Sequence, residues 1–265
     1  MRAIVVMAML LLSGMTARAE PVEIALADGT RLQAELAMPT GPIVAPAIVA
    51  LPGCAGPYPA RDHQWRDALV QQGHIMLFPN SFASRGLGPQ CRVKDRVASS
   101  GGLRRSDAIA AVAWLAQRAG TPPGGIVVMG WSDGGSTVLA AAPHLPAGII
   151  RGFIAFYPGC GVALRDTAWK PVAPMLILMG AADDWTPAKP CRTVADRFTP
   201  AQLTMIAYPG AYHDFDAPGG LRVLQNIPTS QNADKSVHAG TDPAAQADAF
   251  RRVPAFLASL PPVFP

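Results

Sequence analysis

The amino-acid sequence predicts an α/β fold: a mostly parallel sheet with an antiparallel hairpin at its N-terminal end and helices on both faces. Short apolar runs alternate with helical patterns along most of the chain, the order produced by parallel strands joined through crossover helices. The first strands instead flank Asp28-Gly29, a dipeptide typical of a hairpin turn. Of the 265 residues, 50% are hydrophobic and 15% are charged, so the chain can bury a large core.

The expected strands are identified by the pattern of their side chains. Residues 22–27 and 30–36 alternate apolar and polar side chains, as half-buried hairpin strands do. The later strands are short continuous apolar runs, the pattern of strands that are covered on both faces. In chain order these runs are residues 47–51, 75–78, 126–129, 153–157, 175–179 and 203–207.

The expected helices carry apolar side chains on one face and end at residues that break helices. Gly73 ends the first helix, and the second carries Ala, Ile, Val, Trp and Leu on one face. In chain order the helices are residues 62–72, 103–119, 137–142, 188–198 and 244–260. A long loop, residues 79–102, separates the strand 75–78 from the second helix.

Residues 1–19 have the pattern of a secretory signal peptide. Arg2 gives a positive start, residues 4–12 are an apolar run too short to cross a bilayer, and Ala17-Arg18-Ala19 matches a cleavage site. We therefore expect a mature chain, residues 20–265, that forms a single exported domain in the periplasm or outside the cell, with no membrane association once the leader is removed. An uncleaved anchor is the alternative.

Charge and residue spacing exclude several classes of partner. The formal net charge is +4, and no stripe of Lys and Arg runs along the chain, so no nucleic-acid binding is expected. The Cys, His and Asp residues show no spacing typical of metal ligands, so we expect no metal and no cofactor.

The sequence Gly130-Trp131-Ser132-Asp133-Gly134 matches the pattern G-x-S-x-G and stands between an expected strand and an expected helix. In that setting the pattern is a nucleophile elbow, a sharp turn that exposes the serine hydroxyl above the sheet. Glycines two residues before and after Ser132 remove Cβ atoms that would clash in such a turn. The alternative is a glycine-rich connection without chemistry.

Two further segments supply partners for Ser132. Asp183 and Asp184 follow the strand 175–179, and His213 follows the strand 203–207. Ligand sites in such sheets lie beyond the carboxyl ends of the strands, so these side chains should meet there. The order serine, acid, histidine is that of the α/β-hydrolases. The pattern predicts Ser132 as nucleophile and His213 as base, with Asp183 or Asp184 as the acid.

From about residue 46 to residue 215 the chain resembles the dienelactone hydrolase family of α/β-hydrolases. Three motifs carry the resemblance: the elbow 130–135, the acid turn 178–187 and the histidine loop 208–215. The resemblance implies an α/β-hydrolase fold and favours Asp183 as the acid, because it stands three residues after Gly180. Two positions differ, since Ser132 stands where the family's name-giving enzyme has cysteine and Gly53 where it has glutamate. The combination indicates a general serine esterase.

Other residues complete the expected site. The backbone N–H groups of Asp133 and Cys54, each at the start of a loop or helix beyond a strand, are the expected oxyanion donors. Arg85, Trp131 and Trp185 are candidate substrate-binding residues, with packing as the alternative role for the tryptophans and exposure to solvent for the arginine.

The four cysteines should lie near the carboxyl edge of the sheet in pairs that are close in sequence. We therefore expect the disulfides Cys54–Cys91 and Cys160–Cys191. Buried thiols or a different pairing are the alternatives.

Together these features predict an exported serine hydrolase that cleaves a small-molecule carboxylic ester or lactone through an acyl-enzyme. A peptidase or thioesterase on the same scaffold is a second reading, because the fold does not set the leaving group. A non-catalytic binding protein is the third.

Overall fold

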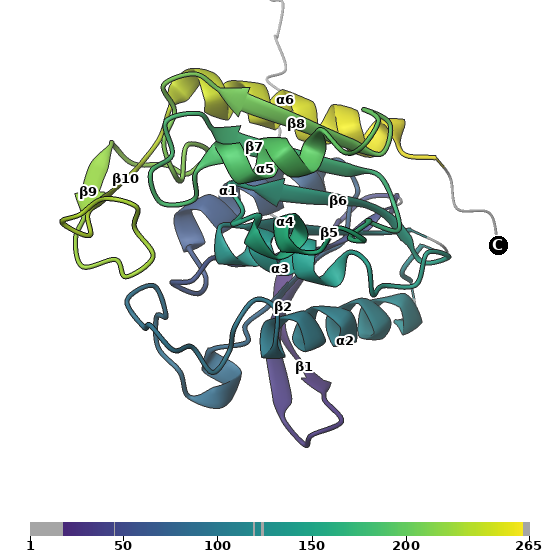
Figure 1. Ribbon diagram of the computed structural model, residues 1–265. Helices are drawn as coiled ribbons and strands as arrows, with labels where there is room; N and C mark the ends of the chain where they lie inside the picture. The colour runs from purple at the N-terminus through teal and green to yellow at the C-terminus, as the bar shows by residue number, and fades with distance from the viewer. Residues whose placement is uncertain (1–17, 45, 119, 123–124, 262–265) are drawn as a thin grey trace, which may run out of the picture.

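The computed structural model describes residues 18–44, 46–118, 120–122 and 125–261. An eight-stranded twisted sheet runs through the centre of the molecule in the order β1-β2-β4-β3-β5-β6-β7-β8 (Figure 1). β1 pairs antiparallel with β2 and β2 pairs antiparallel with β4, whereas all later neighbours are parallel. The strands are β1 (Arg18–Ala25), β2 (Arg31–Met38), β3 (Ala47–Leu51), β4 (Met76–Pro79), β5 (Ile126–Trp131), β6 (Ile150–Phe156), β7 (Met175–Gly180) and β8 (Leu203–Tyr208).

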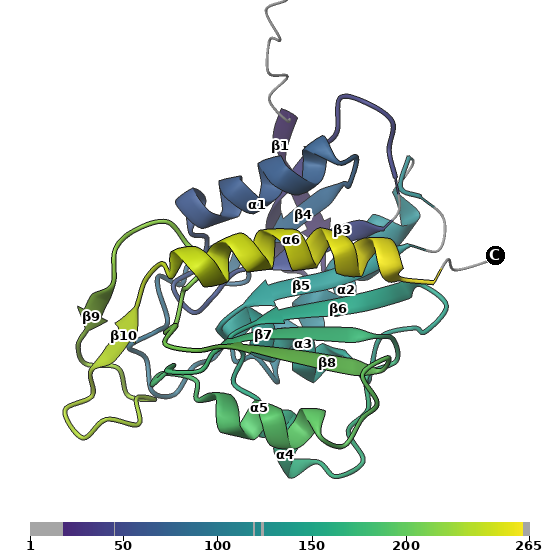
Figure 2. The ribbon, with the colours of Figure 1, turned by 90° about the horizontal axis from the view of Figure 1, so that it is seen from above.

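Helices cover the sheet on both faces. α1 and α6 lie on one face, where the rings of Trp65 and Phe250 stack, and α2 to α5 lie on the other (Figure 2). The helices are α1 (Pro59–Gln71), α2 (Leu103–Gln117), α3 (Asp133–Ala141), α4 (Gly161–Arg165), α5 (Ala188–Ala195) and α6 (Pro243–Ser259). The predicted fold class is confirmed.

The central strands are covered completely. Every residue of β3, β5 and β7 is buried, which is why these segments read as unbroken apolar runs. Both layers of helices therefore hold the carboxyl ends of these strands at one rigid edge, from which the site is built.

Some elements differ from the sequence-based expectation. α3 begins at Asp133, directly after Ser132, and not at residue 137, because the elbow turn starts the helix despite its weakly helical glycines. Sequence patterning also missed α4, a 3₁₀ turn at Ala83–Arg85, and a small antiparallel sheet of β9 (Arg222–Leu224) and β10 (Val237–Ala239). These segments are too short to show a period.

The expected leader, residues 1–19, lies outside the described residues except for its last two. Arg18 and Ala19 begin β1 and pair with Met38 and Ala37. Among the helices of the described ranges, none has the length and apolar character needed to cross a membrane.

Candidate active site

The elbow connects β5 to α3 through Ser132, whose backbone has a φ of 54°. A Cβ atom at Gly134 would collide with the carbonyl oxygen of Leu51, and one at Gly130 would collide with that of Gly134. Only glycine permits this close approach of the helix to the strand, so the two glycines fix the turn. The backbone at Ser132 is strained, as is common at functional sites.

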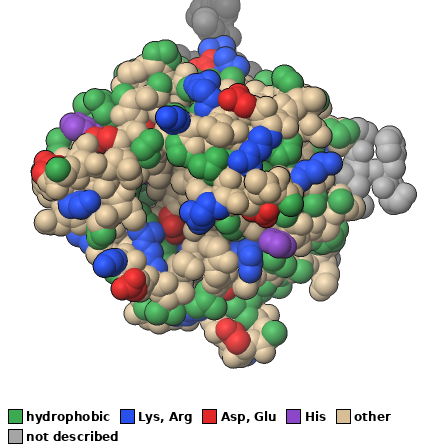
Figure 3. All heavy atoms as spheres, viewed as in Figure 1, with side chains coloured by type: hydrophobic (Ala, Val, Ile, Leu, Met, Phe, Trp, Pro, Cys, Tyr) green, Lys and Arg blue, Asp and Glu red, His purple; other side chains and the backbone are tan. Residues whose placement is uncertain are grey.

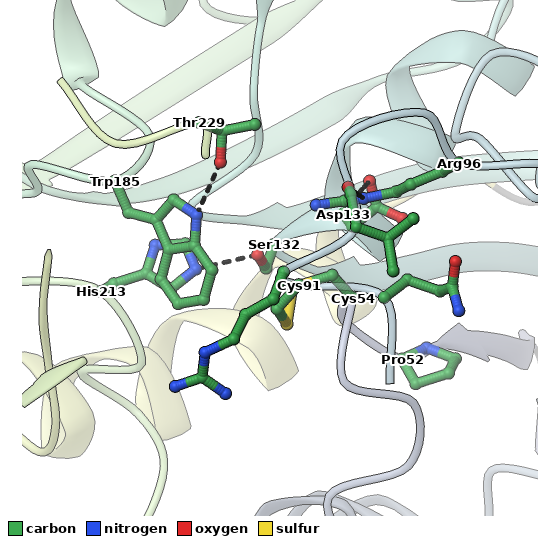
Figure 4. Close-up of a disulfide and its surroundings, with 12 residues drawn as sticks. Pro52, Cys54, Cys91, Arg96, Ser132, Asp133, Trp185, His213 and Thr229 are labelled. Carbon is green, nitrogen blue, oxygen red and sulfur yellow. Dashed lines mark hydrogen bonds and ion pairs between the residues drawn. A yellow bond between two sulfur atoms is a disulfide. The ribbon is translucent and has the colours of Figure 1, made fainter. Parts of the chain in front are cut away.

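Ser132, His213 and Asp183 form a continuous hydrogen-bonded chain. Nε2 of His213 lies 2.8 Å from Oγ of Ser132, and Nδ1 of His213 lies 2.8 Å from Oδ2 of Asp183. His213 is 1% exposed and Asp183 is 5% exposed, so water competes little for these bonds. The serine hydroxyl points to the imidazole at the carboxyl edge of the sheet (Figure 4).

The acid turn after β7 holds the carboxylate of Asp183 in place. Its Oδ1 accepts hydrogen bonds from the backbone N–H groups of Trp185 and Thr186, at 2.9 and 2.8 Å. The hydroxyl of Thr186 lies 3.0 Å from Oδ2 of Asp183 and 3.1 Å from Nδ1 of His213. Sequence reasoning missed Thr186, although a hydroxyl residue three positions after the acid is a recognisable turn signal.

Buried charge sets the protonation of His213. Burial by itself lowers its pKa, but the nearby Asp183 carboxylate and its hydrogen bond, together with Asp214 and Asp216, leave the pKa of His213 above the ordinary value of 6.5. The imidazolium is therefore stabilised where a proton taken from Ser132 would reside.

Asp184, the rival acid, has a different partner. Its Oδ2 lies 2.7 Å from Nδ1 of His238, and its Oδ1 accepts the backbone N–H of His238 at 2.9 Å. Burial raises the pKa of Asp184, but its hydrogen bonds to His238 and Asn232 outweigh this effect and leave the pKa lowered. The geometry therefore brings Asp183, and not Asp184, to His213.

The two expected oxyanion donors lie beside Ser132, and all three residues line one cleft. Asp133 begins α3, and its carboxylate is held by Arg96 at 3.0 Å and by the buried Arg104. Arg104 also donates to the carbonyl oxygen of Pro52, next to the loop of Cys54. The Asp133–Arg104–Pro52 link thus ties one donor segment to the other. Among the described residues, no acceptor is paired with the N–H of Cys54 or of Asp133.

The cysteines pair as Cys54–Cys91, with an S–S distance of 2.06 Å, and Cys160–Cys191. The first disulfide lies beside Ser132 and fastens the loop that carries the N–H of Cys54 (Figure 4). The carbonyl oxygen of Cys54 also accepts the N–H of Gln90 at 2.7 Å, which is a second tether on that loop. The second disulfide joins the start of α4 to α5.

Of the three candidate substrate-binding residues, only Trp185 lies in the site. Trp185 packs on His213 with ring centroids 4.6 Å apart and donates to Thr229 at 3.1 Å, so it lies in the site. Trp131 is fully buried and donates its ring N–H to Asp216, which corrects its assignment as a substrate contact. Arg85 is also outside the site, because its guanidinium is engaged in an ion pair with the buried Asp107 at 2.8 and 2.9 Å.

A buried carboxylate beneath the site was not anticipated. Asp216 accepts hydrogen bonds from the ring N–H groups of Trp65 and Trp131 and from the hydroxyl of Tyr157. Burial raises its pKa, with partial opposition from Arg61 and these hydrogen bonds. The position of Asp216 between the apolar residues Phe215 and Ala217 was the sequence feature that could have indicated a buried carboxylate. Because the Tyr157 ring packs on His213 at 4.5 Å, Asp216 anchors the floor of the site.

Two clefts open at Ser132. The histidine-side cleft, about 570 Å³, is lined by His213 and Asp214; the helix-side cleft, about 590 Å³, is lined by Ser136 of α3 and by α4. Ser132, Cys54 and Trp185 line both. Figure 3 shows a hollow between the β9–β10 side of the molecule and its body.

The sheet, the elbow and the carboxyl-edge site define this protein as an α/β-hydrolase. The family model of the dienelactone hydrolase family matches residues 32–260, so the chain belongs to that family, as its motifs predicted.

Several solved structures share this fold. A candidate dienelactone hydrolase from Klebsiella pneumoniae has a TM-score of 0.68 at 18% identity, covering 92% of this chain and 99% of that one. A dienelactone hydrolase-like promiscuous phosphotriesterase from metagenomic libraries has a TM-score of 0.64 at 18% identity. The match covers 92% of this chain and 99% of that one. Esterase 2 of Thermogutta terrifontis, phosphoramylated by tabun, has a TM-score of 0.62 at 19% identity. The match covers 94% of this chain and 97% of that one. At these identities the likeness concerns the fold.

One curated relative is a monoacylglycerol lipase of Mycolicibacterium smegmatis. It is 33% identical over 84 residues, which are 31% of this chain and 29% of the lipase. The match therefore spans less than a third of either protein.

Proposed function

We propose that this hydrolase cleaves small-molecule carboxylic esters or lactones through an acyl-enzyme, with Ser132 as nucleophile, His213 as base and acid, and Asp183 as the orienting acid. The observation that carries the proposal is the hydrogen-bonded chain from Asp183 through His213 to Ser132, with 2.8 Å at each step. Support also comes from family membership and from the esterases among the structural neighbours.

The residues perform the proposed reaction in two halves. Oγ of Ser132 attacks the acyl carbon while Nε2 of His213 takes its proton, and the resulting oxyanion accepts hydrogen bonds from the N–H groups of Cys54 and Asp133. The carbon–oxygen bond to the alcohol then breaks, and His213 returns the proton to the leaving oxygen. Water then attacks the acyl-Ser132 ester and loses a proton to Nε2 of His213; the bond from the acyl carbon to Oγ breaks, His213 returns the proton to Oγ, and the carboxylic acid departs.

Each neighbour has a defined part in this scheme. Asp183 holds the His213 ring in the tautomer whose Nε2 can accept the serine proton, and it stabilises the imidazolium. Thr186 and the N–H groups of the acid turn hold the carboxylate in its orientation. Preorganised donors near the oxyanion supply several kcal/mol of transition-state stabilisation in such sites.

The proposal includes export and removal of residues 1–19. The two disulfides of the structure fit an oxidising compartment, where such bonds persist. Mass spectrometry of the protein purified from the periplasm or the culture medium tests this directly, since we expect an N-terminus at Glu20.

Labelling with a fluorophosphonate tests the nucleophile. We expect the probe to modify Ser132 in the wild type and to leave Ser132→Ala unmodified. The wild type should hydrolyse p-nitrophenyl acetate, and the variant should retain less than about 1% of that rate. Thioester and peptide substrates in the same panel separate an esterase from a thioesterase or peptidase. A wild type that neither reacts with the probe nor hydrolyses any ester would contradict the proposal.

A further inference from the structure

A segment after the histidine loop lies beside the site and lines both clefts. We call residues 219–240, which contain β9 and β10, the cap; it projects from one side of the sheet (Figure 1). Its base is fastened by hydrogen bonds from the N–H of Thr241 to the carbonyl oxygen of Gly219 and from the N–H of Gly240 to that of His213. The cap therefore starts and ends beside the proposed base.

Contacts inside the site hold the cap in one position. Ile227 and Val237 pack against Cys54 and Trp185 in a small buried apolar cluster. The hydroxyl of Thr229 accepts the ring N–H of Trp185 at 3.1 Å. The Asp184–His238 pair described above joins β10 to the acid turn. These contacts give the cap a fixed geometry relative to Ser132.

The cap forms one wall of each cleft, and the division falls between Ile227 and Pro228. Residues before the division, including Arg222, Leu224 and Ile227, line the histidine-side cleft. The next four residues, 228–231, line the helix-side cleft. One continuous segment thus presents different side chains to the two halves of a bound substrate.

The chemistry of ester cleavage assigns a role to each cleft. In the tetrahedral intermediate the acyl carbon bears the serine oxygen, the oxyanion, the acyl chain and the leaving oxygen. The leaving oxygen must lie near Nε2 of His213 to receive its proton. The alcohol therefore occupies the cleft that His213 lines. The acyl chain extends the other way, along Ser136 and residues 228–231.

The two clefts differ in character. The histidine-side cleft has apolar walls from Pro57, Tyr58, Pro89, Leu224 and Ile227. Of its three guanidinium groups, those of Arg61 and Arg222 are paired with Asp62 and Asp214, and that of Arg92 donates to the backbone carbonyl oxygen of Gln225. The helix-side cleft carries the exposed amide of Gln231 and the exposed guanidinium of Arg165, together with the hydroxyls of Ser136, Thr229 and Ser230, which are hydrogen-bonded within the protein. An alkyl chain placed there would cover the amide and the guanidinium without replacing their hydrogen bonds to water, which is unfavourable.

We infer that the cap makes the enzyme selective for esters of an apolar, aromatic alcohol with a polar acyl group. Leu224 is the determinant on the alcohol side and Gln231 on the acyl side. This inference rests on the proposed esterase function and specifies its substrate class.

Two substrate ratios measure this selectivity. On the acyl side, p-nitrophenyl 3-hydroxybutyrate and p-nitrophenyl 3-methylbutyrate have similar shapes and share one leaving group. We expect kcat/KM to be about tenfold higher for the hydroxylated ester, because only it replaces the hydrogen bonds of the cleft. On the alcohol side, 2-naphthyl acetate and phenyl acetate share one acyl group, and we expect the naphthyl ester to be favoured about tenfold through its larger apolar contact.

Cap variants connect each ratio to its cleft. Leu224→Ala should lower the naphthyl-to-phenyl ratio at least threefold and leave the acyl ratio as it is. Gln231→Leu should lower the hydroxybutyrate-to-methylbutyrate ratio at least threefold and leave the alcohol ratio as it is. Val223→Ala and Gln225→Leu are the matched controls, because these exposed cap residues line neither cleft and should change neither ratio.

The outcomes separate this inference from the proposed function. If the enzyme hydrolyses esters but prefers 3-methylbutyrate, or if Leu224→Ala alters the acyl ratio and Gln231→Leu the alcohol ratio, the cleft assignment is overturned while the esterase proposal stands. If the wild type hydrolyses no ester in the panel, the proposed function fails and this assignment fails with it.

Discussion

Removing the disulfide beside Ser132 should reduce both stability and turnover. The variant Cys54→Ala/Cys91→Ala keeps the backbone N–H of residue 54 and keeps apolar side chains in the cluster with Trp185, Ile227 and Val237. It therefore removes the constraint and leaves the proposed oxyanion donor present. The matched variant Cys160→Ala/Cys191→Ala removes the other disulfide, which fastens α4 to α5.

The two disulfides should contribute similar stability, since their sequence separations are 37 and 31 residues. In the chain-entropy model, loops of that size correspond to about 4 kcal/mol each. For a domain of this size the loss should lower the Tm by roughly 8 to 15 °C in either variant. Differential scanning calorimetry of the purified proteins provides the measurement.

Turnover should distinguish the two variants. Complete loss of one oxyanion donor lowers kcat by roughly 10²- to 10³-fold. The hydrogen bond from the N–H of Gln90 to the carbonyl oxygen of Cys54 remains as a tether, so we expect a smaller loss, about 10- to 100-fold in kcat, with little change in KM. The Cys160→Ala/Cys191→Ala variant should lose less than about threefold when both are measured well below their Tm.

Equal kcat in the wild type and in Cys54→Ala/Cys91→Ala, with the expected drop in Tm, would refute the argument. The disulfide would then stabilise the fold without positioning the backbone of Cys54. Comparable kcat losses in both variants would likewise reject a specific effect on the oxyanion site.

Three further expectations concern the residues around the nucleophile. Asp183→Asn should lower kcat/KM by about 10⁴-fold and Asp184→Asn by less than about tenfold, and the reverse order in steady-state assays would assign the acid to Asp184. kcat/KM should rise with pH because only neutral His213 accepts a proton, and the midpoint of this rise should lie above pH 6.5 because the nearby carboxylates raise the pKa of His213. A pH–rate profile with a midpoint below pH 6.5 would contradict this. Ser132→Gly should have a higher Tm than Ser132→Ala, because glycine relieves backbone strain of about 1–3 kcal/mol at a φ of 54° and adds an entropy cost of only about 0.5–1 kcal/mol. Equal Tm values in calorimetry would show that the elbow stores no such strain.

The sequence by itself determined most of the scaffold. Apolar runs such as 47–51 and 175–179 became fully buried strands, because a strand covered on both faces requires apolar side chains at every position. The elbow could also be predicted from the sequence, because the short distance between strand and helix admits only glycine at positions 130 and 134. These are local constraints, and a local pattern is enough to express them.

The tertiary structure decided which side chains meet. Asp183 and Asp184 are adjacent and chemically identical, and only the packing of the acid turn against the histidine loop directs one to His213 and the other to His238. A Cβ atom at Gly180 would strike the carbonyl oxygens of Ala211 and Tyr212, so the two loops lie in direct contact there. That contact joins segments about 30 residues apart and leaves no periodic signal in the sequence.

Packing between segments that are distant in sequence also explains why the sequence pattern could not assign the roles of Trp131, Trp185 and Arg85. Trp131 and Trp185 both stand next to residues of the proposed triad, yet the side chain of Trp131 is buried and that of Trp185 lines both clefts. The guanidinium of Arg85 is held outside the site by its ion pair with Asp107 of α2. The cap has only three-residue strands, and its position comes from contacts with Cys54 and Trp185. Secondary structure is encoded by neighbours along the chain, whereas the direction of a loop side chain is set by partners that folding brings to it.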